Sequence, residues 1–403
     1  MADIKRITVE QLKPGMFVHD LNCDWMSHPF AFNRFSVKGE EQINKIIQAG
    51  VKELYIDPTR GLDVINAPTA QEVKKELESD LIRIITEEPK KEIKLTLAQE
   101  MVNAKKIHKE AHTIVRNVMQ DARLGKQVQI EKVEPLVEQM TESILRNQGA
   151  LIALCGIKNK DDYTFLHSVS VCTLMVSFCR SLGLPDEQIR QGGIGGLLHD
   201  IGKMNTPLEI LNKPGKYTDE EFAIMRRHPE EGHQILLQTP GVGEVPLTIC
   251  IQHHERMDGT GYPHNLKADQ IDMMGKISAV VDVYDAISSN RCYHKGMEPT
   301  DALRKMLEWS RFHFDPNLVQ AFIRCLGIYP VGSMVMLESG RLAVVVEQNP
   351  SNMLMPTVKA FYDTRKLSHI EPVIRIDLAK TGADRVVSHE SSEKWAVDPM
   401  DYI

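Results

Sequence analysis

The sequence has no long apolar run. Its 403 residues contain no uninterrupted stretch of ~18 apolar residues, so the sequence predicts no transmembrane helix and no membrane insertion. The first thirty residues carry several charges and no signal-peptide apolar core. Low-complexity tracts and internal repeats are missing as well. We therefore expect a soluble, cytoplasmic protein.

An excess of basic charge is missing too. The chain holds 48 Lys and Arg against 55 Asp and Glu, a net charge of −7 with neutral histidines. Such a chain has no global electrostatic reason to bind nucleic acid, and we expect no DNA partner. The seven cysteines are odd in number and include no C-x-x-C pair, which is typical of reduced, mostly buried thiols in the cytoplasm. Composition alone indicates no activity.

The chain divides by texture into four segments. Residues 1–66 combine short strand patterns with one helix pattern, which predicts a small αβ regulatory module. Residues 67–148 are charge-rich and helical. Residues 149–328 are helical and apolar on more than one face, which is typical of a bundle interior. Residues 329–403 switch to short alternating runs. We predict a mainly α protein, with a helical bundle flanked by the αβ module and a β-rich C-terminal appendage.

A stripe of apolar or small residues runs along residues 97–122 at spacings near 3.6. Its members are Leu97, Met101, Ala104, Ala111, Val115, Val118 and Ala122. A helix of this length often packs along a second copy of itself, which would make a homodimer. It can equally lie on the domains on either side, and the sequence leaves both alternatives open.

The dipeptide His199-Asp200 follows an apolar, glycine-rich run, GGIGGLL. We expect this run to be deeply buried. A buried, unpaired aspartate is costly, so Asp200 needs a cation nearby. Lys203 lies three residues after Asp200 and four after His199, so it projects near both from the same helix.

Two further segments carry groups of the same chemistry. His253 and His254 are adjacent imidazoles just ahead of a DGTGYP turn. Helix neighbours point about 100° apart, so both reach one metal only near a helix end. Farther along, a small or polar stripe crosses an apolar helix, as a cavity lined by a carboxylate requires. The stripe consists of Gly275, Ser278, Asp282, Asp285 and Ser289.

Together these residues form a mixed set of imidazoles and carboxylates without thiolates. Such a set suits Fe, Mn, Co, Ni or Zn in a catalytic site and differs from a closed structural zinc site. An aspartate that bridges two metals ~3.5–4 Å apart would produce a hydroxide nucleophile at neutral pH and stabilise charge on a phosphoryl group. We therefore predict phosphoester hydrolysis.

Ordered motifs add a family resemblance. HDIGK at 199–203 resembles the HD motif of the HD phosphohydrolase superfamily, and HHERMDGTGYP at 253–263 resembles the signature of the HD-GYP family of bacterial cyclic dinucleotide phosphodiesterases. The similarity covers roughly residues 150–325 and implies an HD-type helical bundle. Its other parts are LNKPGKYTDEEFAIMRRHPEEG at 211–232 and VVDVYDAISSNRCY at 280–293. LKPGMFV and the segment Trp25 to Phe30 are similar to a module often found ahead of HD-GYP domains.

The resemblance implies two divalent transition metal ions, Fe or Mn first, with Ni, Co or Zn as alternatives. The implied ligands of one metal are His167, His199, Asp200 and Asp282. Asp200 would bridge to a second metal held by His228, His253 and His254.

The resemblance also implies substrate contacts. Lys203 matches the lysine that contacts the scissile phosphate, so Asp200 and Lys203 are the implied catalytic residues. The other implied substrate-binding residues are Gly261, Tyr262, Pro263, Arg291 and His294. Of these, Tyr262 could stack on a base.

Two positions depart from the family pattern. Some members carry a glutamate four residues before the first histidine, where it helps to hold a third metal; here the residue is Tyr163. We therefore expect two metals, which puts a second cleavage of the linear product in doubt. Cys292-Tyr293-His294 replaces the usual Pro, Tyr and basic residue, so base or phosphate contacts there are expected to differ.

The implied function is hydrolysis of a 3′,5′-cyclic dinucleotide to a linear 5′-phosphorylated dinucleotide in bacterial second-messenger signalling. Cyclic di-GMP is the family's usual substrate, and 3′,3′-cyclic GMP-AMP is an alternative because no residue reads a guanine edge unambiguously. The competing hypothesis is a catalytically silent sensor or partner-docking module. A third hypothesis, a mononucleotidase, is disfavoured by the complete GYP segment.

Overall fold

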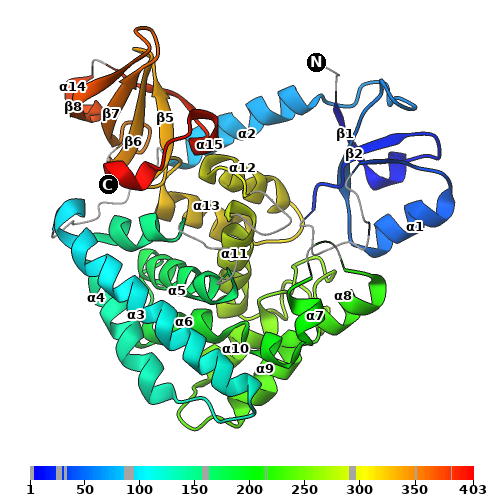
Figure 1. Cartoon of the computed structure of the whole chain (residues 1–403). Coiled ribbons are helices and arrows are strands. Elements are labelled where there is room, and N and C mark those ends of the chain that lie inside the picture. The colour runs from blue at the N-terminus through cyan, green and yellow to red at the C-terminus, as the bar shows by residue number, and fades with distance from the viewer. Residues whose placement is uncertain are drawn as a thin grey trace.

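The computed structural model has a sheet at each end of the chain and a helical bundle between them (Figure 1). The prediction of a mainly α chain with an N-terminal αβ module and a β-rich C-terminal appendage is confirmed. Among the described residues, no helix is long and apolar enough to cross a membrane. The structure describes the chain apart from residues 1–3, 24–29, 31–33, 86–94, 157–162, 214, 216, 290–295, 350–351 and 383.

The N-terminal domain is a four-stranded antiparallel sheet covered by one helix. Its strands have the order β1-β4-β2-β3. Apolar residues of the helix and of β4 form its core, where Ile46, Leu54 and Ile56 are fully buried. Gly50 follows the helix with φ +78°, a left-handed conformation that glycine adopts without strain. The elements are β1 (Lys5–Thr8), β2 (Phe17–Asp20), β3 (Phe35–Ser36), α1 (Glu40–Gln48) and β4 (Glu53–Ile56).

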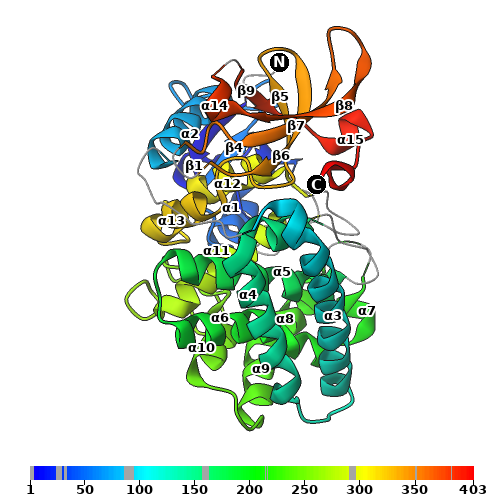
Figure 2. The same cartoon turned by 90° about the vertical axis from the view of Figure 1, so that its left-hand side faces the viewer.

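Three helices lead into the bundle: α2 (Ala70–Ile85), α3 (Leu97–Arg123) and α4 (Ile130–Leu154). A capping box starts α3, in which Thr96 and Gln99 each accept a hydrogen bond from the other's backbone N–H. Helix α3 lies along α4 (Figure 2). All seven residues of the 97–122 stripe are buried in this packing. A second copy would therefore meet other faces of α3, and a homodimer stays a prediction.

The bundle is built around α5 (Tyr163–Ser181), in which every residue from Leu166 to Cys179 is buried. Helix α6 (Asp186–Leu198) packs closely on α5, because Gly193 has no side chain. A Cβ added at Gly193 would lie only 2.8 Å from Val176. The predicted deep burial of GGIGGLL is thus confirmed. The remaining elements are η4 (Ile201–Asn205), α7 (Leu208–Leu211), α8 (Asp219–Met225), α9 (His228–Leu237), α10 (Glu244–Gln252), α11 (Met273–Ser288), α12 (Pro299–Trp309) and α13 (Pro316–Leu326).

The C-terminal domain is a five-stranded antiparallel sheet of order β8-β7-β6-β5-β9. It lies over the end of the bundle that carries α12 and α13 (Figure 1). An ion pair joins the two, with His389 Nε2 2.9 Å from Asp301 of α12. The elements are β5 (Met334–Leu337), β6 (Arg341–Glu347), β7 (Thr357–Asp363), β8 (Ser368–Asp377), α14 (Leu378–Thr381), β9 (Val386–His389) and α15 (Ser392–Trp395).

Candidate metal centre

The end of α6 places His199 and Asp200 in the centre of the bundle. Helix α6 stops at Leu198, His199 caps it, and Asp200 precedes the 3-10 helix η4. Both side chains are 1% exposed. Close helix packing through the glycines of α6 brings the two polar groups to a depth that only apolar residues normally occupy.

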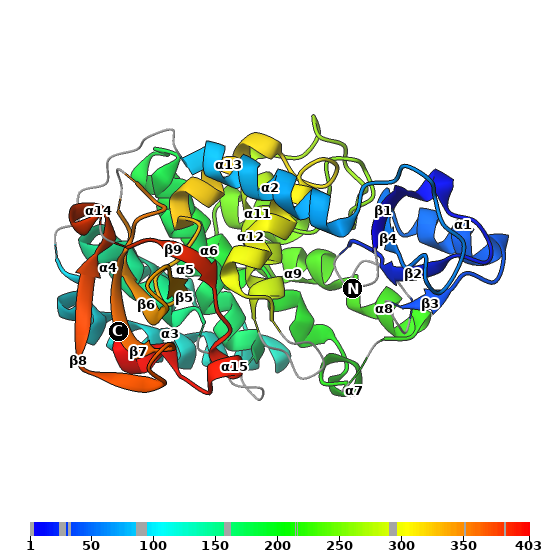
Figure 3. The same ribbon diagram turned by 90° about the horizontal axis from the view of Figure 1, so that it is seen from above.

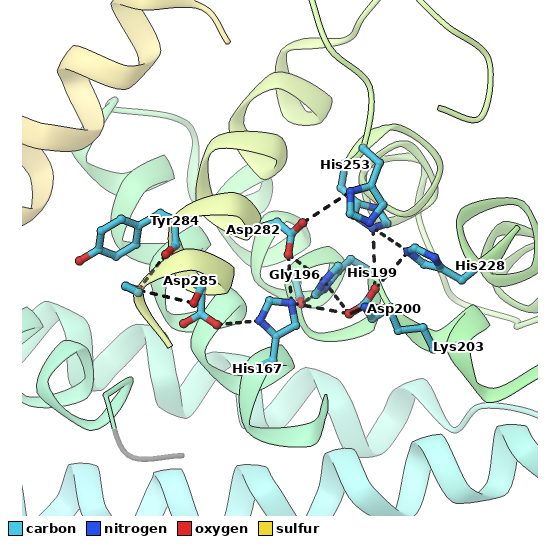
Figure 4. Close-up of polar contacts among 12 residues, drawn as sticks. His167, Gly196, His199, Asp200, Lys203, His228, His253, Asp282, Tyr284 and Asp285 are labelled. Carbon is cyan, nitrogen blue, oxygen red and sulfur yellow. Dashed lines mark hydrogen bonds and ion pairs between the residues drawn. The ribbon is translucent and has the colours of Figure 1, made fainter. Parts of the chain in front are cut away.

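Seven predicted ligands meet there in two groups. Figure 4 labels all of them except His254. Helix α5, the C-cap of α6 and helix α11 supply His167, His199 and Asp282. The N-cap of η4, the start of α9 and the end of α10 supply Asp200, His228, His253 and His254. Within each group the donor atoms lie within 4.8 Å of one another. His253 caps α10 and His254 follows it, the helix-end position that two adjacent imidazoles need.

Asp200 lies between the two groups and directs one oxygen at each. Its Oδ1 atom is 3.3 Å from His228 Nε2 and 3.8 Å from His253 Nε2. Its Oδ2 atom is 3.3 Å from His199 Nε2 and 3.6 Å from His167 Nε2. A carboxylate with one oxygen in each donor group is the arrangement that can bridge two cations.

Four imidazoles are oriented by their other ring nitrogen. The Nδ1 atoms of His199, His228 and His253 lie 2.8 Å from the carbonyl oxygens of Gly196, Met225 and Cys250. The Nδ1 atom of His167 lies 2.6 Å from Asp285 Oδ2. Carbonyl and carboxylate oxygens only accept, so each Nδ1 carries a proton, and each ring can bind a metal ion through its Nε2 atom.

The electrostatics of the site favour bound cations. Burial would raise the pKa of Asp200 and Asp282, but the neighbouring imidazoles, and for Asp200 also Lys203, hold both pKa values well below the usual range. Burial lowers the pKa of His228, and that of His253 to about 3, whereas Asp200 and Asp282 outweigh burial and raise the pKa of His199 to about 10. A bound cation would take the place of the His199 proton. Ionised carboxylates and neutral imidazoles are the forms that bind metal.

Several of the predicted metal-binding atoms form no hydrogen bond within the described part of the chain. The His199 Nε2, Asp200 Oδ1 and His254 Nε2 atoms are buried without a hydrogen-bond partner among the described residues. Each such atom costs about 1–3 kcal/mol when it is left unsatisfied. A divalent cation in each group would satisfy them, and nitrogen and oxygen donors without thiolate suit transition metals. The residues present therefore fit two metal ions.

Lys203 and the turn at 261–263 border the donor groups. The Lys203 Nζ atom is 2.5 Å from Asp200 Oδ2, and its side chain is 15% exposed, so the charge lies at the edge of the buried cluster. The Tyr262 ring stacks on His254, with centroids 4.6 Å apart. The Arg226 guanidinium lies 4.6 Å from the centre of the same ring. Tyr262 thus packs against His254, a predicted metal ligand. The sequence predicted only that Tyr262 could stack on a base.

Glu255, which is 2% exposed, stabilises the turn through hydrogen bonds to its backbone. Its two carboxylate oxygens accept backbone N–H bonds from His264 at 2.7 Å and Leu266 at 2.9 Å. Gly261 allows the chain to pass over Glu255, because a Cβ there would lie 2.5 Å from the Glu255 Cα atom. Pro263 follows Tyr262 in this turn. Arg291 and His294, and with them the Cys292-Tyr293-His294 departure, lie outside the described residues.

Two residues of this centre were given no role from the sequence. Asp285 was recognised only as part of the polar stripe, although its position three residues after Asp282 puts both carboxylates on one helix face. Glu255 is adjacent to His254, and only the fold of the turn reveals what it binds. Tyr163 stacks its ring on His167, with centroids 5.8 Å apart, at the position where some relatives have a glutamate.

Two family models and several curated relatives match the chain. The family model described as "HD domain" matches residues 134–318, and one described as "Domain of unknown function (DUF3391)" matches residues 4–133. A protein of Pseudomonas aeruginosa, named as a cyclic di-GMP phosphodiesterase, is 40% identical over 400 residues, covering 99% of this chain and 95% of its own. A 3′3′-cGAMP-specific phosphodiesterase of Vibrio cholerae is 37% identical over 157 residues, covering 39% of this chain and 36% of its own.

Among solved structures, an HDG"Y"P protein of Bdellovibrio bacteriovorus matches 79% of this chain and 98% of its own with a TM-score of 0.47 and 18% identity. Fold and donor set define a protein of the HD-domain hydrolase class, with His/Asp clusters that could hold divalent metal. Within that class, the near full-length relative and the GYP segment identify the family. The chain belongs to the HD-GYP family.

Proposed function

We propose that the chain is a metal-dependent phosphodiesterase that hydrolyses a 3′,5′-cyclic dinucleotide, cyclic di-GMP or 3′,3′-cyclic GMP-AMP, to a linear 5′-phosphorylated dinucleotide in bacterial second-messenger signalling. The observation that carries the proposal is the placement of Asp200, with one carboxylate oxygen directed at each donor group. The relatives named as cyclic di-GMP and 3′3′-cGAMP phosphodiesterases support the substrate class.

The proposed ligands of the first metal are His167, His199, Asp200 and Asp282. Asp200 also reaches the second metal, which His228, His253 and His254 complete. Fe or Mn is the proposed metal, with Ni, Co or Zn as alternatives, because imidazole and carboxylate donors accept all of these. When bound, two such ions activate water for attack on phosphorus and stabilise the charge that develops there.

The chain's own residues supply orientation and charge. Lys203 presents an ammonium group beside Asp200 at the rim of the site, where it would bind the scissile phosphate and stabilise negative charge in the transition state. Burial of the ligands keeps bulk solvent away from the proposed metals. Gly261, Tyr262 and Pro263 shape the proposed substrate side. Arg291 stays a predicted phosphate contact, and His294 stays a predicted contact to a phosphate or a base.

We further propose that hydrolysis stops at the linear dinucleotide. Tyr163 stacks on His167 and brings no carboxylate to the position where some relatives have a glutamate. A third metal ion, which could bind a terminal phosphate, therefore lacks that donor.

The proposal includes the organisation of the chain. Residues 1–66 would form a regulatory module, 67–148 a helical linker, 149–328 the catalytic domain and 329–403 the appendage. A cytoplasmic location is part of it, because five of the six described cysteines are buried, as is typical of reduced thiols in the cytoplasm.

The test is anaerobic turnover of cyclic di-GMP and 3′,3′-cyclic GMP-AMP, side by side, after loading with Mn(II) or Fe(II). Products are separated chromatographically. Asp200→Asn should lower turnover by more than ~100-fold, since it weakens ligands of both metals. The control is Asp269→Asn, the same chemical change at an exposed carboxylate of the same domain. If neither ring opens while two metals are bound, the silent-sensor hypothesis replaces this one.

A further inference from the structure

The N-terminal domain touches the GYP turn directly. Gly50, in the turn between α1 and β4, packs against Thr260, and a Cβ added to Gly50 would lie 2.7 Å from Thr260 Cβ and 2.9 Å from its Cγ2 and Oγ1 atoms. Figures 1 and 3 both place the N-terminal sheet beside α8, on the side of the bundle where the predicted substrate turn lies. The contact joins two segments that are far apart in the sequence.

His313 holds the same two segments together. It lies between α12 and α13 and is 6% exposed. The backbone of Gly50 lies beside its imidazole. The His313 carbonyl oxygen accepts the Met257 N–H at 3.0 Å. One buried residue therefore contacts the N-terminal domain on one side and bonds the start of the GYP turn on the other.

The N-terminal domain is fixed to α12 by a buried polar network. Glu308 of α12, 4% exposed, accepts hydrogen bonds from the Tyr55 hydroxyl at 2.7 Å and the Asn22 amide at 3.1 Å. Asn22 in turn accepts from Lys305 Nζ at 2.5 Å and Trp309 Nε1 at 3.2 Å. Buried networks in which the donors find acceptors rigidify the surfaces that they join. Gly50 is therefore held in a defined place relative to the bundle.

Inside the turn, the position of Thr260 is transmitted to a proposed metal ligand. The Thr260 hydroxyl and N–H donate to Asp258 Oδ1 at 2.6 and 3.0 Å, which sets the turn. Two residues on, the Tyr262 N–H donates to the His254 carbonyl at 3.1 Å, and the Tyr262 ring stacks on His254. A shift of Thr260 would thus displace the ring that supports His254.

We propose that the N-terminal domain is a built-in positioning element of the active site, in which Gly50 and His313 hold Thr260 and thereby the GYP turn in its productive shape. This inference rests on the proposed phosphodiesterase function. The domain would act on turnover through the 256–263 turn without touching substrate. A displacement of about 1 Å at a reacting centre can cost about 100-fold in rate.

The experiment uses Gly50→Ala in the full chain, which places a methyl group on Thr260. Its matched control is Gly183→Ala. Gly183 has a nearly equal φ of +71° but nothing within 4 Å of an added Cβ. Both variants carry similar backbone strain and should share the small fall in melting temperature that it causes, to which Gly50→Ala adds the cost of the contact with Thr260. We expect only Gly50→Ala to lower kcat/KM for the cyclic dinucleotide, by about 10- to 100-fold.

Two further readouts isolate the contact. Hydrogen exchange of the amides in 255–268 should become faster in Gly50→Ala and stay unchanged in Gly183→Ala. In a Thr260→Gly background, Gly50→Ala should cause no additional loss of turnover, since the atoms it meets are gone. The proposal is overturned if the two alanine variants behave alike, or if Gly50→Ala costs as much in the Thr260→Gly background. If the wild-type chain opens neither ring, the proposed function fails, and hydrogen exchange still decides whether the domain orders the turn.

Discussion

His167 is held between two carboxylates of one helix. Its Nδ1 atom lies 2.6 Å from Asp285 Oδ2, and its Nε2 atom lies 3.0 Å from Asp282 Oδ1. Asp285 therefore fixes the tautomer and the orientation of the His167 ring. Asp282 lies on the Nε2 side of this ring, which faces the metal centre. Partners of this kind raise the basicity of a ligating imidazole.

The first prediction concerns this pair. Asp285→Asn should weaken metal affinity and lower turnover, each by about 10- to 100-fold, because the imidazole loses its charged acceptor. Metal binding is measured by titration with Mn(II), and turnover is measured at low and saturating metal. Asp272→Asn is the control on the same helix; its side chain caps α11, a role that asparagine also performs. Equal metal affinity in both variants would contradict the role of Asp285.

Lys203 gives the second prediction. Lys203→Met should lower kcat by about 100-fold or more, because the ammonium group stabilises charge that develops in the transition state. Two metals should still bind, since the lysine is not among the proposed ligands. Metal content by elemental analysis and kcat on the same sample separate the two effects. A variant that keeps kcat but loses metal would mean that Lys203 serves only to pair Asp200.

Glu308 gives a prediction about stability. Glu308→Gln should lower the free energy of unfolding by about 2–4 kcal/mol, because the network loses its central anion. Lys305 would keep the neutral Asn22 oxygen and the more exposed Asp20, and Arg6 would keep Glu53. The exposed pair of Glu338 and Arg385 offers the control, and Glu338→Gln should change stability by less than about 0.5 kcal/mol. Denaturant titration measures both. Similar values for the two variants would contradict a buried junction.

The ion pair between α3 and α4 predicts a pH dependence. Burial would raise the pKa of Glu100, but hydrogen bonds from Arg146, Asn103 and Ser143 outweigh it and lower the pKa below its usual 4.5. The unfolded chain therefore binds this proton more readily. The contribution of Glu100 to the free energy of unfolding is complete at pH values above the usual pKa of a glutamate, and it is lost as the pH falls below that pKa.

The measurement is unfolding by denaturant across this pH range. Glu100→Gln should remove part of the acid-side slope and lower stability at neutral pH by about 1–3 kcal/mol. Glu110→Gln, at an exposed glutamate of the same helix, should leave the slope unchanged. An unchanged slope in Glu100→Gln would show that this pair is not the titrating element.

Local patterns were enough to predict much of this molecule. The apolar run before His199-Asp200 indicated burial, and the resemblance assigned seven ligands that the fold brings together. The 97–122 stripe predicted a helix face but could not show what covers it, since periodicity is the same for a partner copy and for α4. The bridge of His313 to Gly50 and Met257 could not be predicted, because it depends on segments that meet only after folding.

The network around Glu308 has a consequence for how this enzyme can be dissected. Deletion of residues 1–66 would expose the Glu308 carboxylate and the Trp309 indole of α12 to water. The remaining fragment would therefore lose buried surface of the bundle as well as the N-terminal domain. Any change in its activity would mix the loss of the contact between Gly50 and Thr260 with damage at the newly exposed face of α12. Point substitutions at the contact between Gly50 and Thr260 leave the N-terminal domain in place. They can therefore distinguish a regulatory role of this domain from a purely structural one.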